Sequence, residues 1–181
     1  MHLTVLIPTY NRHTMLKRTL DSLIRAKIPP EMAVRVIVID NNSKDDTRKT
    51  VEDYAGGNAL SIEYIFEAKQ GRSFALNAGI ATASGDLIAM IDDDEEVDQH
   101  WYSVIHSSFG QGNLDFIGGP YKPRWGAPVP RWLPRNYLGA IGWVDGGDQV
   151  RAYGRNYPGI LMGGNAVLTR SILDRVGPYS T

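Results

Sequence analysis

The stretch that decides the fold is LIAMIDDDEE, residues 87–96, in which five apolar residues lead directly into five acidic ones. An unbroken apolar run of this length is typical of a strand that is buried on both faces of a sheet. Runs rich in strand-forming residues at 3–7, 36–39 and 62–66 predict three more strands. The last of four predicted strands therefore ends in a concentrated group of carboxylates.

Segments whose apolar or small residues are typical of helices lie between these strands. Four apolar residues share one face of a helix over residues 15–26: Leu16, Leu20, Leu23 and Ile24. Thr14 is the expected N-cap of this helix, and Ser43 with Asp46 forms a capping-box pattern for a second helix that runs to about residue 54. Small residues over 73–83, closed by Gly85, predict a third helix.

The alternation of four strands with three helices predicts a Rossmann-like α/β fold, with a mainly parallel sheet and helices on both faces. Ligands of such sheets bind at the carboxyl ends of the strands. Here those ends carry polar and acidic residues: Pro8-Thr9-Tyr10, Asp40-Asn41-Asn42, Glu67 and Asp92-Asp93-Asp94. The sequence therefore predicts a ligand site along one acidic edge of the sheet.

Residues 120–150 form a proline-rich segment that carries Trp125, Trp132 and Trp143. Proline at this density breaks regular structure, whereas disordered linkers are poor in aromatic residues. Two hypotheses remain open: the tryptophans belong to a mobile lid over the site, or they pin a long loop to the core. We divide the chain into an α/β half, 1–119, and a Pro/Trp-rich part, 120–181, within one domain.

The chain of 181 residues has a net charge of −1, no cysteine and 43% hydrophobic residues. This balance gives no basic field that would attract nucleic acid, and the lack of thiols excludes disulfides and thiolate metal sites. The N-terminus shows no basic-apolar leader, and no apolar run is long enough to span a bilayer. We expect a cytoplasmic protein, and peripheral association with the inner face of a membrane stays open.

Asp92 and Asp94 can face one ion together, because residues i and i+2 of an extended segment project to the same side. Hard cations such as Mg²⁺ or Mn²⁺ prefer carboxylate oxygens and keep positions open for phosphate. Such an ion would bridge the two phosphates of a nucleoside diphosphate and stabilise that leaving group as a Lewis acid. The alternative is a solvated acidic turn that opens a helix.

Other strand-end residues also have two interpretations. Asp40 would accept hydrogen bonds from a base or ribose, or form an Asx turn toward Ser43. Arg72, at a predicted helix start, would meet an anion together with backbone N–H groups, or lie on the surface. The fingerprints of dinucleotide-binding, P-loop and α/β-hydrolase proteins are absent, and the spacing of the four histidines does not suit a metal site.

Taken together, these residues resemble the family 2 glycosyltransferases, which have the GT-A fold. The matching segments, in chain order, are Val5-Leu6-Ile7-Pro8-Thr9-Tyr10-Asn11-Arg12, Val38-Ile39-Asp40-Asn41-Asn42-Ser43, Asp46-Thr47, Gly71-Arg72-Ser73, Asn77-Ala78-Gly79, Ala83-Ser84-Gly85-Asp86, Ile91-Asp92-Asp93-Asp94-Glu95 and Gly163-Gly164-Asn165-Ala166. Each segment is weak evidence alone, and their order and spacing carry the resemblance.

The resemblance implies an inverting, metal-assisted transfer of a sugar from a nucleotide-diphosphate sugar of the UDP or GDP type. The implied acceptor is a hydroxyl of a sugar, a lipid-linked molecule or another compound, as in polysaccharide or cell-envelope biosynthesis. The residues implied in nucleotide binding are Pro8, Thr9, Tyr10, Arg12, Asp40, Asn41, Gly71, Arg72, Asn77, Asp92 and Asp93. Asp94 with Asp92 is implied in binding Mn²⁺ or Mg²⁺, and Gly163-Gly164-Asn165 in lining the donor and acceptor pocket.

Two departures from the family pattern affect these expectations. Leu76 stands where the family often has an arginine, so Arg72 would supply that charge. The family's general base lies beyond the Gly-Gly-Asn segment, so we expect it beyond Thr181, in a C-terminally incomplete GT-A fold that binds donor but turns over poorly. Three acidic residues follow residue 115: Asp145, Asp148 and Asp174. The first two are unsupported substitutes for the base, and the third is expected on a helix surface.

Two other functions remain open. A sugar-nucleotide nucleotidyltransferase would share the sheet and the acidic site, but it needs a Gly-rich basic loop where this chain has Pro8-Thr9-Tyr10-Asn11-Arg12. A non-catalytic nucleotide- or carbohydrate-binding module would need no general base. The intact acidic run, by which we mean Asp92-Asp93-Asp94, argues against such an origin.

Overall fold

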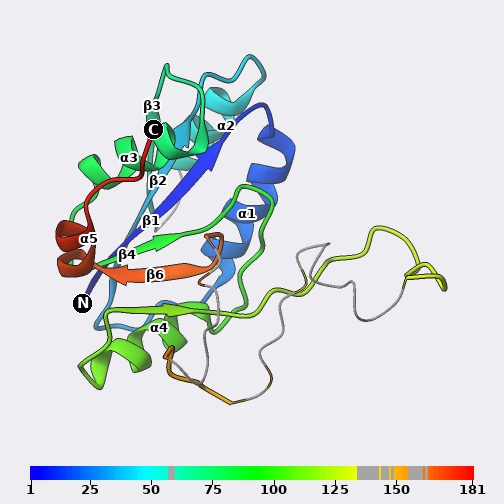
Figure 1. Cartoon of the computed structure of the whole chain (residues 1–181). Helices are drawn as coiled ribbons and strands as arrows, with labels where there is room; N and C mark the ends of the chain where they lie inside the picture. Colours follow the sequence, from blue (N-terminus) through cyan, green and yellow to red (C-terminus); the bar gives the residue numbers. More distant parts are fainter. Residues whose placement is uncertain (57–59, 134–142, 144–146, 148, 155–160, 162) are drawn as a thin grey trace.

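The computed structural model describes residues 1–56, 60–133, 143, 147, 149–154, 161 and 163–181 (Figure 1). Its strands are β1 (His2–Thr9), β2 (Ala33–Asp40), β3 (Ser61–Phe66), β4 (Leu87–Met90), β5 (Phe116–Gly118) and β6 (Ala166–Thr169). Its helices are α1 (His13–Arg25), α2 (Thr47–Ala55), α3 (Arg72–Thr82), α4 (Trp101–Gly110) and α5 (Arg170–Val176). All four strands and three helices predicted from residues 1–91 are therefore present, with small shifts at their ends.

The strands form one sheet in the order β3-β2-β1-β4-β6-β5. The pairs β1–β2, β1–β4 and β2–β3 are parallel, and β6 pairs antiparallel with both β4 and β5. The chain leaves β1 to build β2 and β3 on one side and then crosses to β4 on the other. This reversal at β1 is the point of an open α/β sheet at which ligands usually bind. The predicted mainly parallel α/β fold is confirmed.

Strand β1 continues through Pro8 to Thr9, beyond the end of the strand predicted at 3–7. Leu6 accepts a hydrogen bond from the N–H of Ile91, so the backbone of Leu6, and of Pro8 two residues later, faces the β4 side. Strand β4 has already ended there, at Met90. The missing N–H of Pro8 therefore costs no ladder bond, which is why a proline is tolerated in a central strand.

Two apolar cores cover the two faces of the sheet. One core joins β1, β2 and β4 to α1, α2 and α4, with Leu20, Val51 and Tyr102 among its members. The other joins the alternate side chains of the same strands to α3 and α5, through Leu76 and Leu173. Because both faces are covered, the central strands are largely apolar, as the sequence indicated, with Thr4 of β1 and Arg35 of β2 as exceptions.

The predicted helix caps are wrong. Helices α1 and α2 have no hydrogen bond from a side chain at their own N-cap positions. Instead Asp45 serves both: one carboxylate oxygen accepts from the backbone N–H of His13, and the other from the N–H and hydroxyl of Thr47. The hydroxyl of Thr14 bonds the His13 ring, and Ser43 accepts from Asn11. The residue that caps α1 comes from a different part of the chain, which a local pattern does not show.

Residues 119–133 lead away from the sheet as an extended segment (Figure 1). Trp125 and Trp132 on this segment are both exposed, Trp132 at 78%. Most of residues 134–148 lie outside the described residues, so both the lid and the pinned loop stay predictions. The division of the chain at residue 119 also stays a prediction. Within the part that the structure describes, no helix is long and apolar enough to cross a membrane.

Candidate functional site

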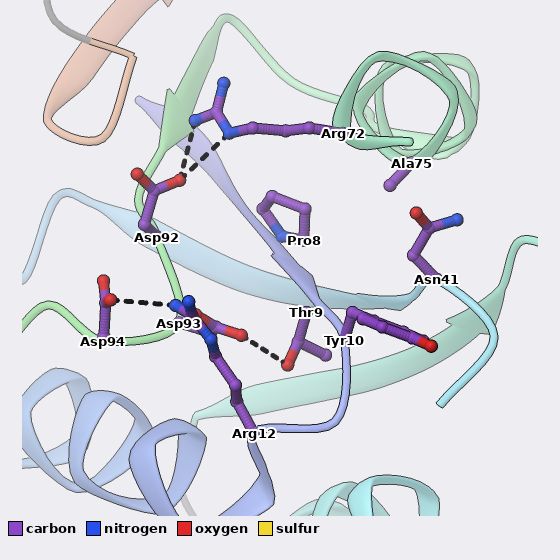
Figure 2. Close-up of a pocket in the computed structure, with 10 residues that line it drawn as sticks. All are labelled: Pro8, Thr9, Tyr10, Arg12, Asn41, Arg72, Ala75, Asp92, Asp93 and Asp94. Atoms are coloured by element: carbon purple, nitrogen blue, oxygen red, sulfur yellow. Dashed lines mark hydrogen bonds and ion pairs between the residues drawn. The ribbon is translucent and has the colours of Figure 1, made fainter. Parts of the chain in front are cut away.

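A pocket of about 320 Å³ opens at the carboxyl ends of β1, β2 and β4, beside the first turn of α3 (Figure 2). Its lining residues are Pro8, Thr9, Tyr10, Arg12, Asn41, Arg72, Ala75, Asp92, Asp93 and Asp94. It lies at the reversal of strand order beside β1, where ligands of such sheets bind. All of the lining residues except Ala75 belong to the set predicted from the sequence.

The three aspartates of the acidic run have different partners (Figure 2). Asp92 accepts from Nε and Nη2 of Arg72, at 3.2 and 2.7 Å. Asp93 accepts from the hydroxyl of Thr9 at 2.7 Å and from Nη1 of Arg12 at 3.2 Å. Asp94 accepts from the same Nη1 at 2.9 Å. Two arginines from opposite sides of the pocket thus share one short acidic segment.

Asp93 is the buried member of the run, at 5% exposure. The hydroxyl of Thr19, on α1, also donates to its backbone carbonyl at 2.9 Å. Burial raises the pKa of Asp93, while the hydroxyl of Thr9 and the charge of Arg12 oppose that rise. In turn, the charge of Asp93 is the main cause that raises the pKa of Arg12. Asp93 therefore ties the acidic run to β1 and α1 rather than presenting its carboxylate to solvent.

Glu95 lies between the acidic run and the segment before β6. Its carboxylate accepts from the backbone N–H of Asp92 at 3.1 Å. Burial is the main cause that raises its pKa to about 7, and the charges of Asp92 and Asp94 add to the rise. A Cβ at Gly164 would overlap this carboxylate, so only glycine fits there without a shift. The sequence pattern predicted no role for Glu95, because its position beneath Gly164 is a long-range contact.

The donor groups of the site suit a hard divalent cation. The carboxylates of residues 92–95 face two guanidinium groups, those of Arg12 and Arg72, so negative charge is in excess. The side chains of Asp92 and Asp94 are 39% and 47% exposed and can offer oxygen atoms to the pocket. In the described part of the chain, however, no group of three or more His or acidic side chains gathers around one point. An ion held here would need further oxygens from a ligand.

Asp40 and Asn41 were predicted to meet a base. The structure keeps Asp40 out of the pocket, since its buried carboxylate accepts from the N–H of Ser43 and the hydroxyl of Tyr64, both at 2.8 Å. Asn41 lines the pocket, but its amide donates to the carbonyls of Glu67 and Lys69. The hydrogen bond from the N–H of Ser43, three residues on, supports the alternative in which Asp40 stabilises a local turn toward Ser43. Both side chains fasten neighbouring loops.

Gly71 and Asn77 were also predicted to bind nucleotide, and the structure places neither in the pocket lining. The N–H of Gly71 donates to the side chain of Asn41 at 2.7 Å, so it is not free for an anion. The amide of Asn77 makes two hydrogen bonds with the backbone of Tyr179, at 2.8 and 2.9 Å. Asn77 therefore holds the segment after α5 against α3.

Gly163, Gly164 and Asn165 adjoin the site without lining the pocket. Nη2 of Arg72 donates to the carbonyl of Gly163 at 3.0 Å. The side chain of Asn165 accepts from the indole N–H of Trp101 at 3.0 Å. Through Arg72, the predicted donor and acceptor segment is connected to the acidic run.

Ala75 is the lining residue that the sequence pattern did not predict. It is fully buried in the first turns of α3 and contributes a small side chain to the pocket lining. The only sequence signal was the run of small residues in this helix. Of the acidic residues considered as substitutes for a base, Asp145 and Asp148 lie outside the described residues, and Asp174 is exposed on α5, as expected.

The sequence matches the family model described as "Glycosyl transferase family 2" over residues 4–177. It is 29% identical over 133 residues to the succinoglycan biosynthesis protein ExoM of Rhizobium meliloti (strain 1021), covering 74% of this chain and 43% of that protein. It is 27% identical over 187 residues to the glucosyl-dolichyl phosphate glucuronosyltransferase of Haloferax volcanii, covering 100% of this chain and 56% of that protein. The chain thus spans about half the length of the curated relatives it matches.

The fold is similar to that of the mannosyltransferase PcManGT from Pyrobaculum calidifontis, solved in complex with GDP-Man and Mn²⁺. The TM-score is 0.71 at 21% identity, over 98% of this chain and 47% of the other. At this identity the similarity concerns the fold.

Proposed function

The chain belongs to glycosyl transferase family 2, and on that premise we propose that it binds the nucleotide-diphosphate sugar of an enzyme that transfers the sugar, with inversion, to an acceptor hydroxyl. The observation that carries the proposal is the pocket beside β1, which combines an aromatic ring, two guanidinium groups and exposed carboxylates. Membership in this family favours sugar transfer over the alternative of a sugar-nucleotide nucleotidyltransferase.

The two ends of the pocket suit the two ends of a nucleoside diphosphate. Tyr10, at 45% exposure, offers a ring at the end of β1 on which a base can stack. Pro8 and Asn41 give that end its shape. Arg72 stands at the start of α3 with its guanidinium over the pocket and is the proposed partner of the diphosphate. Arg72 thereby takes the charge that the family often places at the position of Leu76.

Asp94 and Asp92 are the proposed ligands of Mn²⁺ or Mg²⁺, because their exposed carboxylates are the kind of oxygen donor that these ions prefer. The complex of PcManGT, which contains GDP-Man and Mn²⁺ together, supports this choice. When bound, the ion supplies Lewis-acid stabilisation of the departing diphosphate. The part of this chain is to hold and orient the donor, and Asp93 contributes by fixing the backbone between the two ligands.

The segment before β6 supplies the acceptor side of the proposed site. Gly163, Gly164 and Asn165 border the pocket through Arg72 and are proposed to lie beside the transferred sugar. The name of the Haloferax volcanii relative, which contains a dolichyl phosphate, supports a lipid-linked acceptor. An acceptor of this kind would place the reaction at a membrane surface. ExoM, named for succinoglycan biosynthesis, supports a role in making a polysaccharide.

Titration calorimetry with UDP and GDP, each with and without Mn²⁺, tests the proposal on this chain. We expect one of the two nucleotides to bind at least about ten times more tightly with Mn²⁺, because a bridging ion adds contacts of well over about 1.4 kcal/mol. Asp94→Asn should remove most of this gain. Asp98→Asn is the matched control, since Asp98 is exposed and outside the pocket lining. Binding that is equal with and without Mn²⁺, or an Asp94→Asn chain that behaves like the control, contradicts the proposal.

A further inference from the structure

Arg12 stands immediately before α1 and reaches across the mouth of the pocket to the acidic run (Figure 2). A single nitrogen, Nη1, lies 3.2 Å from a carboxylate oxygen of Asp93 and 2.9 Å from one of Asp94. The two partners differ in environment: the Asp93 side chain is 6% exposed and the Asp94 side chain 47%. Arg12 therefore has one buried partner and one that solvent can reach.

The buried partner is fixed by contacts that do not involve Arg12. Thr9 donates to the carboxylate of Asp93, and Thr19 donates to its backbone carbonyl. Asp94 has no such ties among the hydrogen bonds of the described residues, apart from the one with Arg12. If Asp94 turned toward another cation, Arg12 would therefore keep its place on Asp93.

From this asymmetry we infer that Arg12 is the chain's own counter-cation for Asp94, which it holds until a divalent ion arrives together with the diphosphate. This inference rests on the proposed function and adds to it an order of events. The guanidinium of Arg12 neutralises part of the charge of the acidic run. A bare ion therefore binds weakly, and the ion is retained only as a complex with the nucleotide.

The charges of the site give the reason. A bare ion would have to displace Arg12 from Asp94, whereas removal of Arg12 leaves Asp93 and Asp94 with an uncompensated charge that a bare ion can neutralise. A diphosphate supplies oxygen ligands for the ion and a new anionic partner for Arg72. Bound with the diphosphate, the ion therefore has ligands and charge balance that it lacks when it comes alone.

The test uses Mn²⁺ alone, without nucleotide, and follows thermal unfolding of the chain and of Arg12→Gln. Glutamine can still donate to Asp93 but carries no charge. We expect millimolar Mn²⁺ to raise the melting temperature of Arg12→Gln by several degrees, at least about 3 °C, and that of the unchanged chain by less than about 1 °C. Arg48→Gln is the control, because Arg48 is also ion-paired, to Glu52 at 2.8 Å, but lies on α2 away from the pocket. This control should respond to Mn²⁺ as the unchanged chain does.

Two further variants identify the atoms involved. Arg12→Lys keeps the charge and should be as insensitive to Mn²⁺ alone as the unchanged chain. Adding Asp94→Asn to Arg12→Gln should abolish the stabilisation by the ion. Strong stabilisation of the unchanged chain by Mn²⁺ alone overturns the inference. So does an Arg12→Gln chain whose melting temperature Mn²⁺ fails to raise, or whose folding Mn²⁺ fails to restore if the substitution unfolds it. The proposed function fails separately, if the unchanged chain binds neither UDP nor GDP in the presence of Mn²⁺.

Discussion

Asp93 is held in place by a hydrogen bond from Thr9 and an ion pair with Arg12, and it is the buried member of the acidic run. The three aspartates 92–94 are chemically identical and adjacent, so composition and spacing treat them alike. In the fold, Asp93 is buried against Thr9 and Arg12, whereas Asp92 and Asp94 stay partly exposed. One residue of the run therefore fixes the backbone, and the two beside it remain open to a ligand.

Thr9→Val tests the anchoring of Asp93, because valine keeps the shape of threonine but cannot donate the 2.7 Å hydrogen bond. A buried carboxylate oxygen would lose a partner, and we expect the free energy of unfolding to fall by about 1–2 kcal/mol. Urea unfolding measures this loss. Thr14→Val, at an exposed position on α1, is the control and should change stability by less than about 0.5 kcal/mol. Equal effects of the two substitutions would argue against an anchoring role.

At the scale of elements, the helices show which boundaries are local and which are not. The apolar spacing of residues 16–24 identifies α1 because it reflects the helical period itself. The N-termini of α1 and α2, in contrast, meet at one side chain, Asp45. Although burial opposes it, hydrogen bonds from Thr47 and His13 lower the pKa of Asp45 to about 2. This single carboxylate couples two helices that are separated by β2.

Asp45→Ala should therefore destabilise the fold in a manner that depends on pH. The folded pKa lies below the ordinary value of 3.8, so the carboxylate contributes stability above about pH 4, and that contribution is lost as the pH falls toward 2. We expect a loss of about 1–2 kcal/mol at pH 7, and a smaller loss at pH 3, in urea unfolding at both values. Asp46→Ala is the control, because Asp46 is the N-cap residue of α2 but makes no capping hydrogen bond. A loss that is the same at both pH values, or shared by the control, would contradict this account.

At the scale of the whole molecule, the acidic run lies between two parts of the sheet. Strands β1 to β4 form the parallel part, and β6 returns from beyond residue 160 to pair with β4. The segment before β6 approaches closely enough for Gly164 to rest on the carboxylate of Glu95, and Gly163 on the guanidinium of Arg72. These glycines permit the second part of the chain to close against the pocket.

Gly164→Ala tests this closure, since the added Cβ would overlap the Glu95 carboxylate. We expect the free energy of unfolding to fall by about 1 kcal/mol, because the overlapping group is the end of the flexible Glu95 side chain and can shift. In a Glu95→Ala background the same substitution should cost much less, because the group that it meets is gone, and a double-mutant cycle measures that difference. Gly126→Ala is the control, as nothing lies within 4 Å of its added Cβ. A loss that Glu95→Ala leaves unchanged would show that the contact is not the cause.

The sequence by itself determined the order of strands and helices in residues 1–91, the mainly parallel sheet and the edge at which polar residues gather. These features follow from the periods of apolar residues and from the chemistry at strand ends, which are properties of neighbouring residues. Only the tertiary structure decided which carboxylates are partly exposed, why Asp40 and Asn77 point to loops instead of the pocket, and how one aspartate serves two helices. Each of these depends on contacts between residues that are 24 to 102 positions apart, and such contacts exist only once the chain has folded.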